Sequence, residues 1–288
     1  MSRAGGVRFG RQRLVRDDQA GLPRLLYRLM GVADPAHYLH YLYCRDALDR
    51  FGPEHPRAIL DAGSERGDFT VYLAERYPEA SVLGIDVDRG HLDRAARYTA
   101  PLGLANVSYR EQDLARLDAE AAYDLIVCID VLEHIAEQDE ALRRIRRALR
   151  PGGVAFLHLP TARTIPSPLA RWLRDFHRWS EEEHVARERS AEEMAGAVAA
   201  AGLEILEVRE TFGYFAGELA TSLFDMPYRN TVRNRIVQAL LAPVCRLLVL
   251  ADRRYPGKAR FAVAITARAP GPRSGAEIGP AAGGPRPR

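Results

Sequence analysis

Short apolar runs alternate with amphipathic stretches through the middle of the chain. The runs predict strands over residues 58–61, 81–86, 107–109, 123–129 and 154–159. Between them, apolar residues recur at helical spacing and predict helices over 68–76, 88–100 and 137–149. Strands that alternate with helices indicate an α/β fold, a doubly wound parallel sheet.

A second part of the pattern begins near residue 190. Ser190 and Glu193 form the capping-box pair of a helix over 190–201, and Gly202 ends it. Strands are predicted over 203–209 and 259–266, and a long apolar stretch separates them. We therefore expect a core over 57–211, an apolar helical cap inserted over 212–258 and a final strand segment over 259–269.

The two ends of the chain have a different composition. Residues 1–20 carry arginines with little periodicity and are expected to form a flexible basic arm, followed by an N-terminal helical segment over 21–56. Residues 270–288 are rich in proline, glycine and alanine and are expected to be disordered.

Composition narrows the class of protein. The chain is 47% hydrophobic and 27% charged, and no apolar run reaches the roughly 20 residues that cross a bilayer. Its 41 basic residues nearly balance 38 acidic ones, so nucleic acid is not an expected partner. Cys44, Cys128 and Cys245 lie far apart without metal or disulfide spacing, so we expect a cytoplasmic protein.

The most specific motif is ILDAGSERG at residues 59–67. An apolar strand ends in Asp61, turns on Gly63 and Gly67, and leads into a helix. In an open parallel sheet, a cofactor binds at the carboxyl ends of the strands, and glycines let the backbone approach it closely. Asp86, at the end of the second strand, stands where a carboxylate can accept both hydroxyls of a ribose.

The loop discriminates between two classes of cofactor. A dinucleotide requires GxGxxG, which brings backbone amides against a pyrophosphate. Here the anionic Glu65 lies between the two glycines and would repel a pyrophosphate. Asp61 instead suits a cationic ligand, and S-adenosylmethionine carries an ammonium and a sulfonium but no phosphate.

With these residues the chain resembles the class I S-adenosylmethionine-dependent methyltransferases. The resemblance covers about residues 58–206. It rests on LDAGSERG at 60–67, GID at 84–86, QDL at 112–114, DLIVCIDVLEHI at 124–135 and LRPGG at 149–153. VLEH at 131–134 looks like the branch of the ubiquinone-pathway and small-molecule methyltransferases, and HVAR at 184–187 is similar to the same branch.

The resemblance implies a Rossmann-like seven-stranded sheet with the last strand antiparallel, and S-adenosyl-L-methionine as cofactor. It also implies roles for individual residues. Asp61 and Gly63 would hold the methionine end, with Gly67 packed beneath it, and Asp86 would hold the ribose. Val87 and Leu114 would flank the adenine, Asp113 would accept from its amino group, and Ile129 would offer its carbonyl near the ammonium.

Two features bear on the chemistry. Many relatives have glycine where Glu65 stands, so this loop is expected to be bulkier or to bind the cofactor less tightly. No Asn/Asp-Pro-Pro-Tyr/Phe motif follows the fourth strand, which disfavours methylation of a base or amide nitrogen, and no acidic cluster has metal spacing. O-methyl transfer without a metal fits best, with C-methyl transfer as the close alternative.

Histidines and one glutamate are candidates for the catalytic group. A histidine near neutrality could take the proton of a hydroxyl acceptor, and His134 and His184 are the candidates for this, with Glu133 as an electrostatic partner. His134 could equally cap a helix, and Glu133 could simply serve helix electrostatics. His158, on an apolar strand, is more typical of a core histidine, and His177 ranks below His184.

The expected function is therefore methyl transfer (EC 2.1.1.-) to a small molecule, lipid-like in one interpretation. The alternatives are a non-catalytic methyltransferase-like binding protein and, less favoured, a nicotinamide-dependent oxidoreductase. The segment 212–258 is expected to pack on the sheet as a cap. A sharper hypothesis is that its basic and apolar residues rest on an anionic membrane surface.

Overall fold

The computed structural model describes residues 9–11, 25, 28, 34–161, 186, 189–220, 232–255 and 260–271. These residues form a seven-stranded sheet in the order β3-β2-β1-β4-β5-β7-β6. The strands are β1 (Ala58–Ala62), β2 (Ser81–Asp86), β3 (Val107–Glu111), β4 (Tyr123–Ile129), β5 (Leu149–Pro160), β6 (Glu204–Thr211) and β7 (Ala262–Arg268).

The predicted fold class is confirmed. β1 pairs in parallel with β2 and β4, and the parallel pairing extends to β3 and β5, whereas β7 runs antiparallel to both β5 and β6. The last strand was predicted over 259–266 and lies at Ala262–Arg268 instead. Its residues are buried on both faces, so no alternation of polar and apolar positions marks where it begins or ends.

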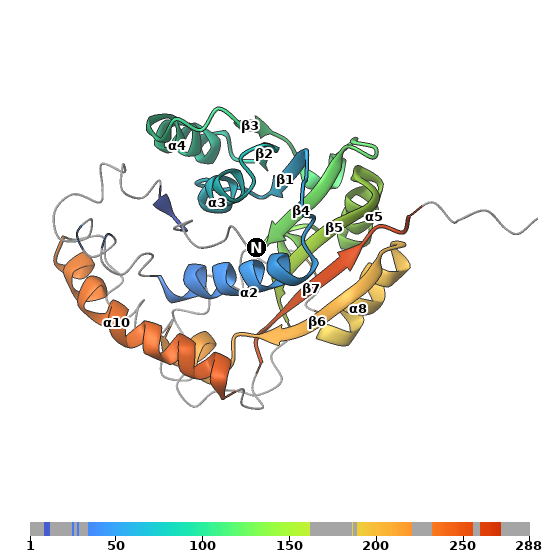
Figure 1. Cartoon of the computed structure of the whole chain (residues 1–288). Coiled ribbons are helices and arrows are strands. Elements are labelled where there is room, and N and C mark those ends of the chain that lie inside the picture. Colours follow the sequence, from blue (N-terminus) through green and yellow to red (C-terminus); the bar gives the residue numbers. More distant parts are fainter. Residues whose placement is uncertain are drawn as a thin grey trace, which may run out of the picture.

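Helices cover both faces of the sheet (Figure 1). The helices α2 (Pro35–Phe51) and α3 (Asp68–Arg76) contribute to one apolar cluster, and α5 (Gln138–Ala148) and α8 (Ala191–Ala200) contribute to the other. The helix α4 (Arg89–Thr99) packs on β2 and β3 at one edge. The capping box of Ser190 and Glu193 at the start of α8 is present as predicted.

The helix α2 comes before the motif-bearing core in sequence and packs against it. Asp34 caps it by accepting hydrogen bonds from the backbone N–H groups of Ala36 and His37, and Pro35 occupies the first turn, where a missing N–H costs nothing. Leu39, Cys44 and other apolar residues of α2 are buried in the same cluster as α3. This packing fixes the α2 side chains that face the carboxyl ends of the strands.

One expectation for the N-terminal arm needs correction. Phe9 is buried, stacks on Tyr41 at 4.7 Å between ring centroids, and contacts Phe69 and Tyr72. Burying an aromatic ring is strongly favourable even in an arginine-rich segment. Phe9 therefore belongs to the hydrophobic core and not to a flexible arm. Residues 1–8 and 12–20 of the arm, and 272–288 of the predicted disordered tail, lie outside the described residues.

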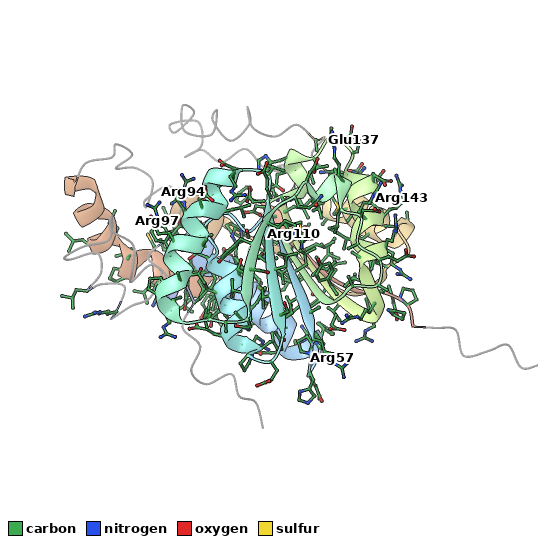
Figure 2. All side chains as sticks on the ribbon, turned by 90° about the horizontal axis from the view of Figure 1, so that it is seen from above. Arg57, Arg94, Arg97, Arg110, Glu137 and Arg143 are labelled. Atoms are coloured by element: carbon green, nitrogen blue, oxygen red, sulfur yellow. The ribbon has the colours of Figure 1, made fainter. Side chains whose placement is uncertain are left out.

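The strand order reverses between β1 and β4. Parallel strands on either side of such a switch point leave a crevice beyond their carboxyl ends. Figure 2 separates the two ends of the sheet: Arg57 directly precedes β1, and Glu137 lies at the opposite end, beyond β4. Asp61 and Ile129, at the carboxyl ends of β1 and β4, therefore lie at the same end of the sheet as Glu137.

The region between β6 and β7 is helical where the structure describes it. A π-helical stretch, η6 (Tyr214–Ala220), is followed by α10 (Val232–Arg254). α2 lies between α10 and the sheet (Figure 1). Among the described residues, no helix combines the length and the apolar character that crossing a membrane requires.

Candidate functional site

The loop after β1 is shaped by two glycines in left-handed backbone conformations. Gly63 has φ of +80° and Gly67 has φ of +79°. A Cβ at Gly63 would lie 2.1 Å from Cγ2 of Val131, and one at Gly67 would lie 2.3 Å from the Tyr109 hydroxyl. Glycine is thus required at both positions for two reasons: the backbone is left-handed, and a Cβ would clash with a neighbouring side chain. The close approach to Val131 also brings this loop against the segment that follows β4.

Asp61 is buried at the carboxyl end of β1. Its Oδ2 accepts a hydrogen bond of 2.5 Å from the Thr70 hydroxyl of α3. Burial raises the pKa of Asp61 to about 7, against the opposing effect of this hydrogen bond. Asp61 is therefore a carboxyl group whose charge a nearby cation would favour.

Asp86 holds the loop from the end of β2. Its two carboxylate oxygens accept hydrogen bonds of 2.9 Å from the backbone N–H groups of Glu65 and Asp88. A carboxylate has about four lone-pair sites, so both oxygens can still accept from a ribose. The next residue, Val87, keeps 68% of its surface exposed, which leaves it available to an adenine ring.

Glu65 occupies the position where glycine was expected in many relatives. Its φ of 44° is unusual for a residue with a side chain. Its carboxylate lies 3.1 Å from Nε of Arg66 and 3.9 Å from Nε2 of His37. Desolvation opposes its ionisation, but His37 and Arg66 outweigh it and lower the pKa of Glu65. Its negative charge is thus partly balanced within the site.

The remaining predicted cofactor residues lie along the same end of the sheet. Asp113 caps the short helix η4 (Leu114–Arg116) by accepting from the Ala115 N–H at 2.8 Å, and its side chain remains 39% exposed. Leu114 is buried, and Ile129 is half-buried at the end of β4. Asp86 and Ile129 are the last residues of β2 and β4, and Asp61 is the last but one of β1, which lies between them.

A cluster that sequence reasoning missed lies beside the loop. Asp130 directly follows β4, with its backbone in the left-handed region at φ of 52°. One carboxylate oxygen lies 2.9 Å from Nδ1 of His158 on β5, and the other lies 3.2 Å from Nε2 of His40 on α2. Nε2 of His158 lies 3.0 Å from the Thr211 hydroxyl at the end of β6. Three strands and one helix thus converge on one carboxylate.

The cluster is electrostatically asymmetric. His40 and His158 are buried, whereas the Asp130 side chain is 39% exposed. Burial lowers the pKa of His40 to about 3, so its imidazole is neutral near pH 7. Desolvation opposes ionisation of Asp130, but the two histidines outweigh it and hold its pKa well below its usual range. Asp130 is therefore an ionised and accessible carboxylate, and two buried imidazole rings hold it in place.

The same three side chains have the composition of a metal site. One ligand atom from each of His40, Asp130 and His158 lies within 4.8 Å of the others, so they could hold a metal ion. Hydrogen bonds already account for the arrangement, because both ring nitrogens of His158 have partners. The interpretation of His158 as a satisfied core histidine is confirmed.

The three predicted catalytic residues have different environments. Glu133 is buried in the short helix η5 (Leu132–His134), and within the described residues its Oε2 has no hydrogen-bond partner. Burial raises the pKa of Glu133 well above its usual range, and the charge of Asp130 adds to the shift. His134 ends η5 and is exposed. His184, like His177 and the aromatic residues Trp172, Phe176 and Trp179, lies outside the described residues.

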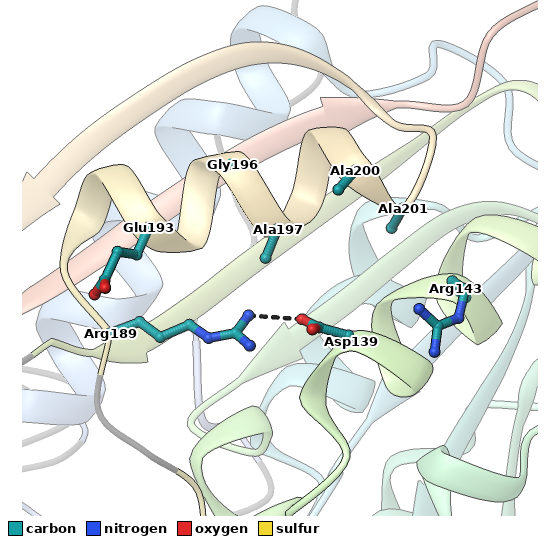
Figure 3. Close-up of a pocket in the computed structure, with 8 residues that line it drawn as sticks. All are labelled: Asp139, Arg143, Arg189, Glu193, Gly196, Ala197, Ala200 and Ala201. Carbon is teal, nitrogen blue, oxygen red and sulfur yellow. Dashed lines mark hydrogen bonds and ion pairs between the residues drawn. The ribbon is translucent and has the colours of Figure 1, made fainter.

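A separate cavity lies on the outer surface, away from these groups. It has a volume of about 420 Å³ and is formed between α5 and α8 (Figure 3). Two arginines and two acids line it, and one of each is already paired, since Arg189 donates to Asp139 at 2.7 Å. The small side chains of α8, such as Ala197, leave the space open. This balanced cavity shares no residue with the loop or with the Asp130 cluster.

Comparison with known proteins identifies the family of the chain. Residues 36–208 match the family model described as methyltransferase domain, which is more than half of the chain. A trans-aconitate 2-methyltransferase from Methylobacterium nodulans is 33% identical over 139 residues, which are 46% of this chain and 52% of that protein. The chain thus matches about half the length of such curated relatives.

Solved structures show the same fold. A phosphoethanolamine N-methyltransferase 2 from Haemonchus contortus, solved in complex with S-adenosyl-L-methionine, superimposes with a TM-score of 0.58 at 18% identity, covering 87% of this chain and 60% of that one. A [4+2]-cyclase, SpnF, does so with a TM-score of 0.57 at 23% identity, covering 82% of each chain. The chain belongs to the methyltransferase domain family, of the class I S-adenosylmethionine-dependent type that its motifs predicted.

Proposed function

We propose that the protein transfers a methyl group from S-adenosylmethionine to a hydroxyl oxygen of a small molecule. The observation that carries this proposal is Asp130, an ionised and accessible carboxylate that His40 and His158 support beside the loop of residues 63–67. Methylation of a hydroxyl group requires a proton acceptor at this place, whereas methylation of a carboxylate does not.

The residues around the loop fit the cofactor. Asp61 offers a carboxylate to the ammonium group, and Asp86 offers free lone pairs to the ribose hydroxyls. Within the described residues, the buried Ser64 hydroxyl has no hydrogen-bond partner, as expected of a polar atom that a ligand satisfies. When bound, S-adenosylmethionine supplies an electrophilic methyl group on a sulfonium.

The main work of the protein in such a transfer is alignment and exclusion of water. The α2 helix serves both, since its buried residues fix His40 against the carboxyl ends of the strands. His40 and His158 each hold one oxygen of Asp130, and Thr211 holds the far nitrogen of His158. The carboxylate therefore has one orientation toward an acceptor.

Asp130 accepts the hydroxyl proton in this proposal. As the new C–O bond forms and the C–S bond breaks with its electron pair on sulfur, the acceptor oxygen becomes strongly acidic. Even a carboxylate of depressed pKa can take a proton from such an oxygen. His40 and His158 are positioning residues, because they act through Asp130.

With Asp130 as the proton acceptor, the catalytic roles predicted for Glu133 and His134 have less support. Burial, with the charge of Asp130, raises the pKa of Glu133 and so disfavours the charged form that would steer a cationic transition state. His134 is exposed at the end of η5 and is the rival base. The acceptor is proposed to be a polar-headed or lipid-like metabolite, in keeping with the apolar segment between β6 and β7.

The test is product analysis with hydroxylated, carboxylated and carbon-nucleophile acceptors, using S-adenosylmethionine that carries a labelled methyl group. The proposal expects an O-methyl ether, formed by the unaltered protein and nearly lost in Asp130→Asn. A product methylated on carbon would contradict O-transfer. Equal activity of Asp130→Asn and the unaltered protein would contradict the role of Asp130.

A further inference from the structure

The helix α10 presents an apolar stripe to the surroundings. Leu240, Val244, Leu247 and Leu250 recur at helical spacing along it, and they keep 67%, 46%, 67% and 50% of their surfaces exposed. Isolated exposed leucines need no explanation, but a continuous row over about three turns does. Figures 1 and 2 both place α10 at the periphery of the molecule.

The opposite side of α10 is the side that holds it to the protein. Ala242, Cys245 and Val249 are buried, and the buried Asp252 accepts a 2.9 Å hydrogen bond from the Gly213 N–H. The helix is therefore anchored by one face, and the exposed apolar row is not the face on which its docking depends.

Charge indicates what the exposed face meets. The 23-residue helix has a single acid, Asp252, which is buried, and two of its arginines, Arg246 and Arg253, contact aromatic and acidic side chains of α2. Arg254 is exposed and lies over the Tyr255 ring, with 5.3 Å between the guanidinium carbon and the ring centroid; Tyr255 itself is 66% exposed. An apolar row with a tyrosine and an arginine at its end, on a helix whose one acid is buried, suits the boundary between anionic lipid headgroups and acyl chains.

We propose that α10 is an interfacial helix that docks the protein on an anionic membrane surface. The apolar row enters the headgroup boundary, and Arg254 contacts the anionic lipid. This surface is independent of the site at the ends of β1, β2 and β4, so docking does not require the proposed methyl transfer to be correct.

The experiment is flotation of the full chain with vesicles of phosphatidylcholine alone or with phosphatidylglycerol, at low and high salt. The expected result is binding to the phosphatidylglycerol vesicles that weakens as salt screens the charges. The double variant Leu240→Glu/Leu247→Glu should lower vesicle partitioning at least about tenfold, because two leucines no longer leave water.

The control variant is Ala199→Glu, which adds a negative charge at an exposed position of α8. It should bind vesicles as the unaltered chain does, and circular dichroism should show all three proteins folded. Absence of binding to anionic vesicles, or equal binding to both lipid compositions, would overturn the proposal. So would a dimer in sedimentation that the double variant dissolves while vesicles remain unbound, since the row would then be a contact between two copies.

Discussion

Asp130 depends on its neighbours for its chemistry. A carboxylate with two hydrogen-bonded oxygens stays ionised over the physiological range, and its exposed edge can reach an acceptor. Asp130→Asn keeps the size of the side chain but removes the charge and the basic oxygen. We expect kcat to fall between about 10²- and 10⁴-fold, the usual contribution of a general base. Steady-state kinetics with labelled S-adenosylmethionine measures this.

The matched comparison for Asp130 is His134→Gln, which removes the rival base from an exposed position. If Asp130 accepts the proton, His134→Gln changes kcat by less than about tenfold. The opposite ranking of the two variants would make His134 the base. Calorimetric affinity for S-adenosylmethionine should be similar in both variants, which separates chemistry from cofactor binding.

Asp61 predicts a pH dependence of cofactor binding. Because its pKa is raised to about 7, the carboxyl group is mostly protonated below that pH, and a cationic ligand must then displace the proton. Affinity for S-adenosylmethionine should fall as pH decreases below 7, by up to about tenfold per pH unit, and should level off above 7. Calorimetry at a series of pH values measures the profile.

Two variants sharpen the test of Asp61. Asp61→Asn should flatten the profile at weak affinity. Thr70→Val removes the hydrogen bond that favours the ionised form, so the midpoint should move to higher pH. A profile that is flat for the unaltered protein would remove Asp61 from the ammonium site.

Asp86 combines ligand contact with support of the loop. Its carboxylate accepts from the N–H groups of Glu65 and Asp88, so Asp86→Ala loses both the ribose acceptor and the loop anchor. We expect cofactor affinity to fall about 10- to 100-fold, as for the loss of one or two hydrogen bonds to a charged group. An unchanged dissociation constant would refute the assignment. Asp88→Ala, which removes the N-cap of α4, controls for local loosening.

At the level of elements, the parallel core could be predicted and the Asp130 cluster could not. The strands and helices from Ala58 to Ala148 follow local periodicity, which a window of sequence displays. His40, Asp130 and His158 lie on three elements far apart in sequence, and their meeting depends on how α2 packs on the sheet. The available signal was that Asp130 directly follows β4, at the switch point of the sheet.

The capping of α2 links stability to the site. Asp34 accepts from two backbone N–H groups in the first turn of the helix that carries His40. Asp34→Ala should lower the free energy of unfolding by about 1 kcal/mol, in the range of lost N-caps. Urea unfolding measures this, and Asp34→Asn, which retains a capping oxygen, should lose clearly less. Equal losses in the two variants would show that capping is not the reason.

The whole molecule divides its work between two regions. The first five strands and the loops at their carboxyl ends form the proposed cofactor side, through residues that a short motif brings together. The proposed acceptor side would draw on α2 before that core and on the segment between β6 and β7 after it. Such distant segments carry no motif of their own, which is why sequence reasoning reached the cofactor before the chemistry of the acceptor.

The central claim is that this fold binds S-adenosylmethionine at the ends of β1 and β2. Calorimetric titration of the full chain with S-adenosylmethionine, S-adenosylhomocysteine and NAD tests it most directly. We predict that the first two bind at one site per chain, that they compete with each other, and that NAD does not bind. Binding of NAD alone, or of none of the three, would contradict it.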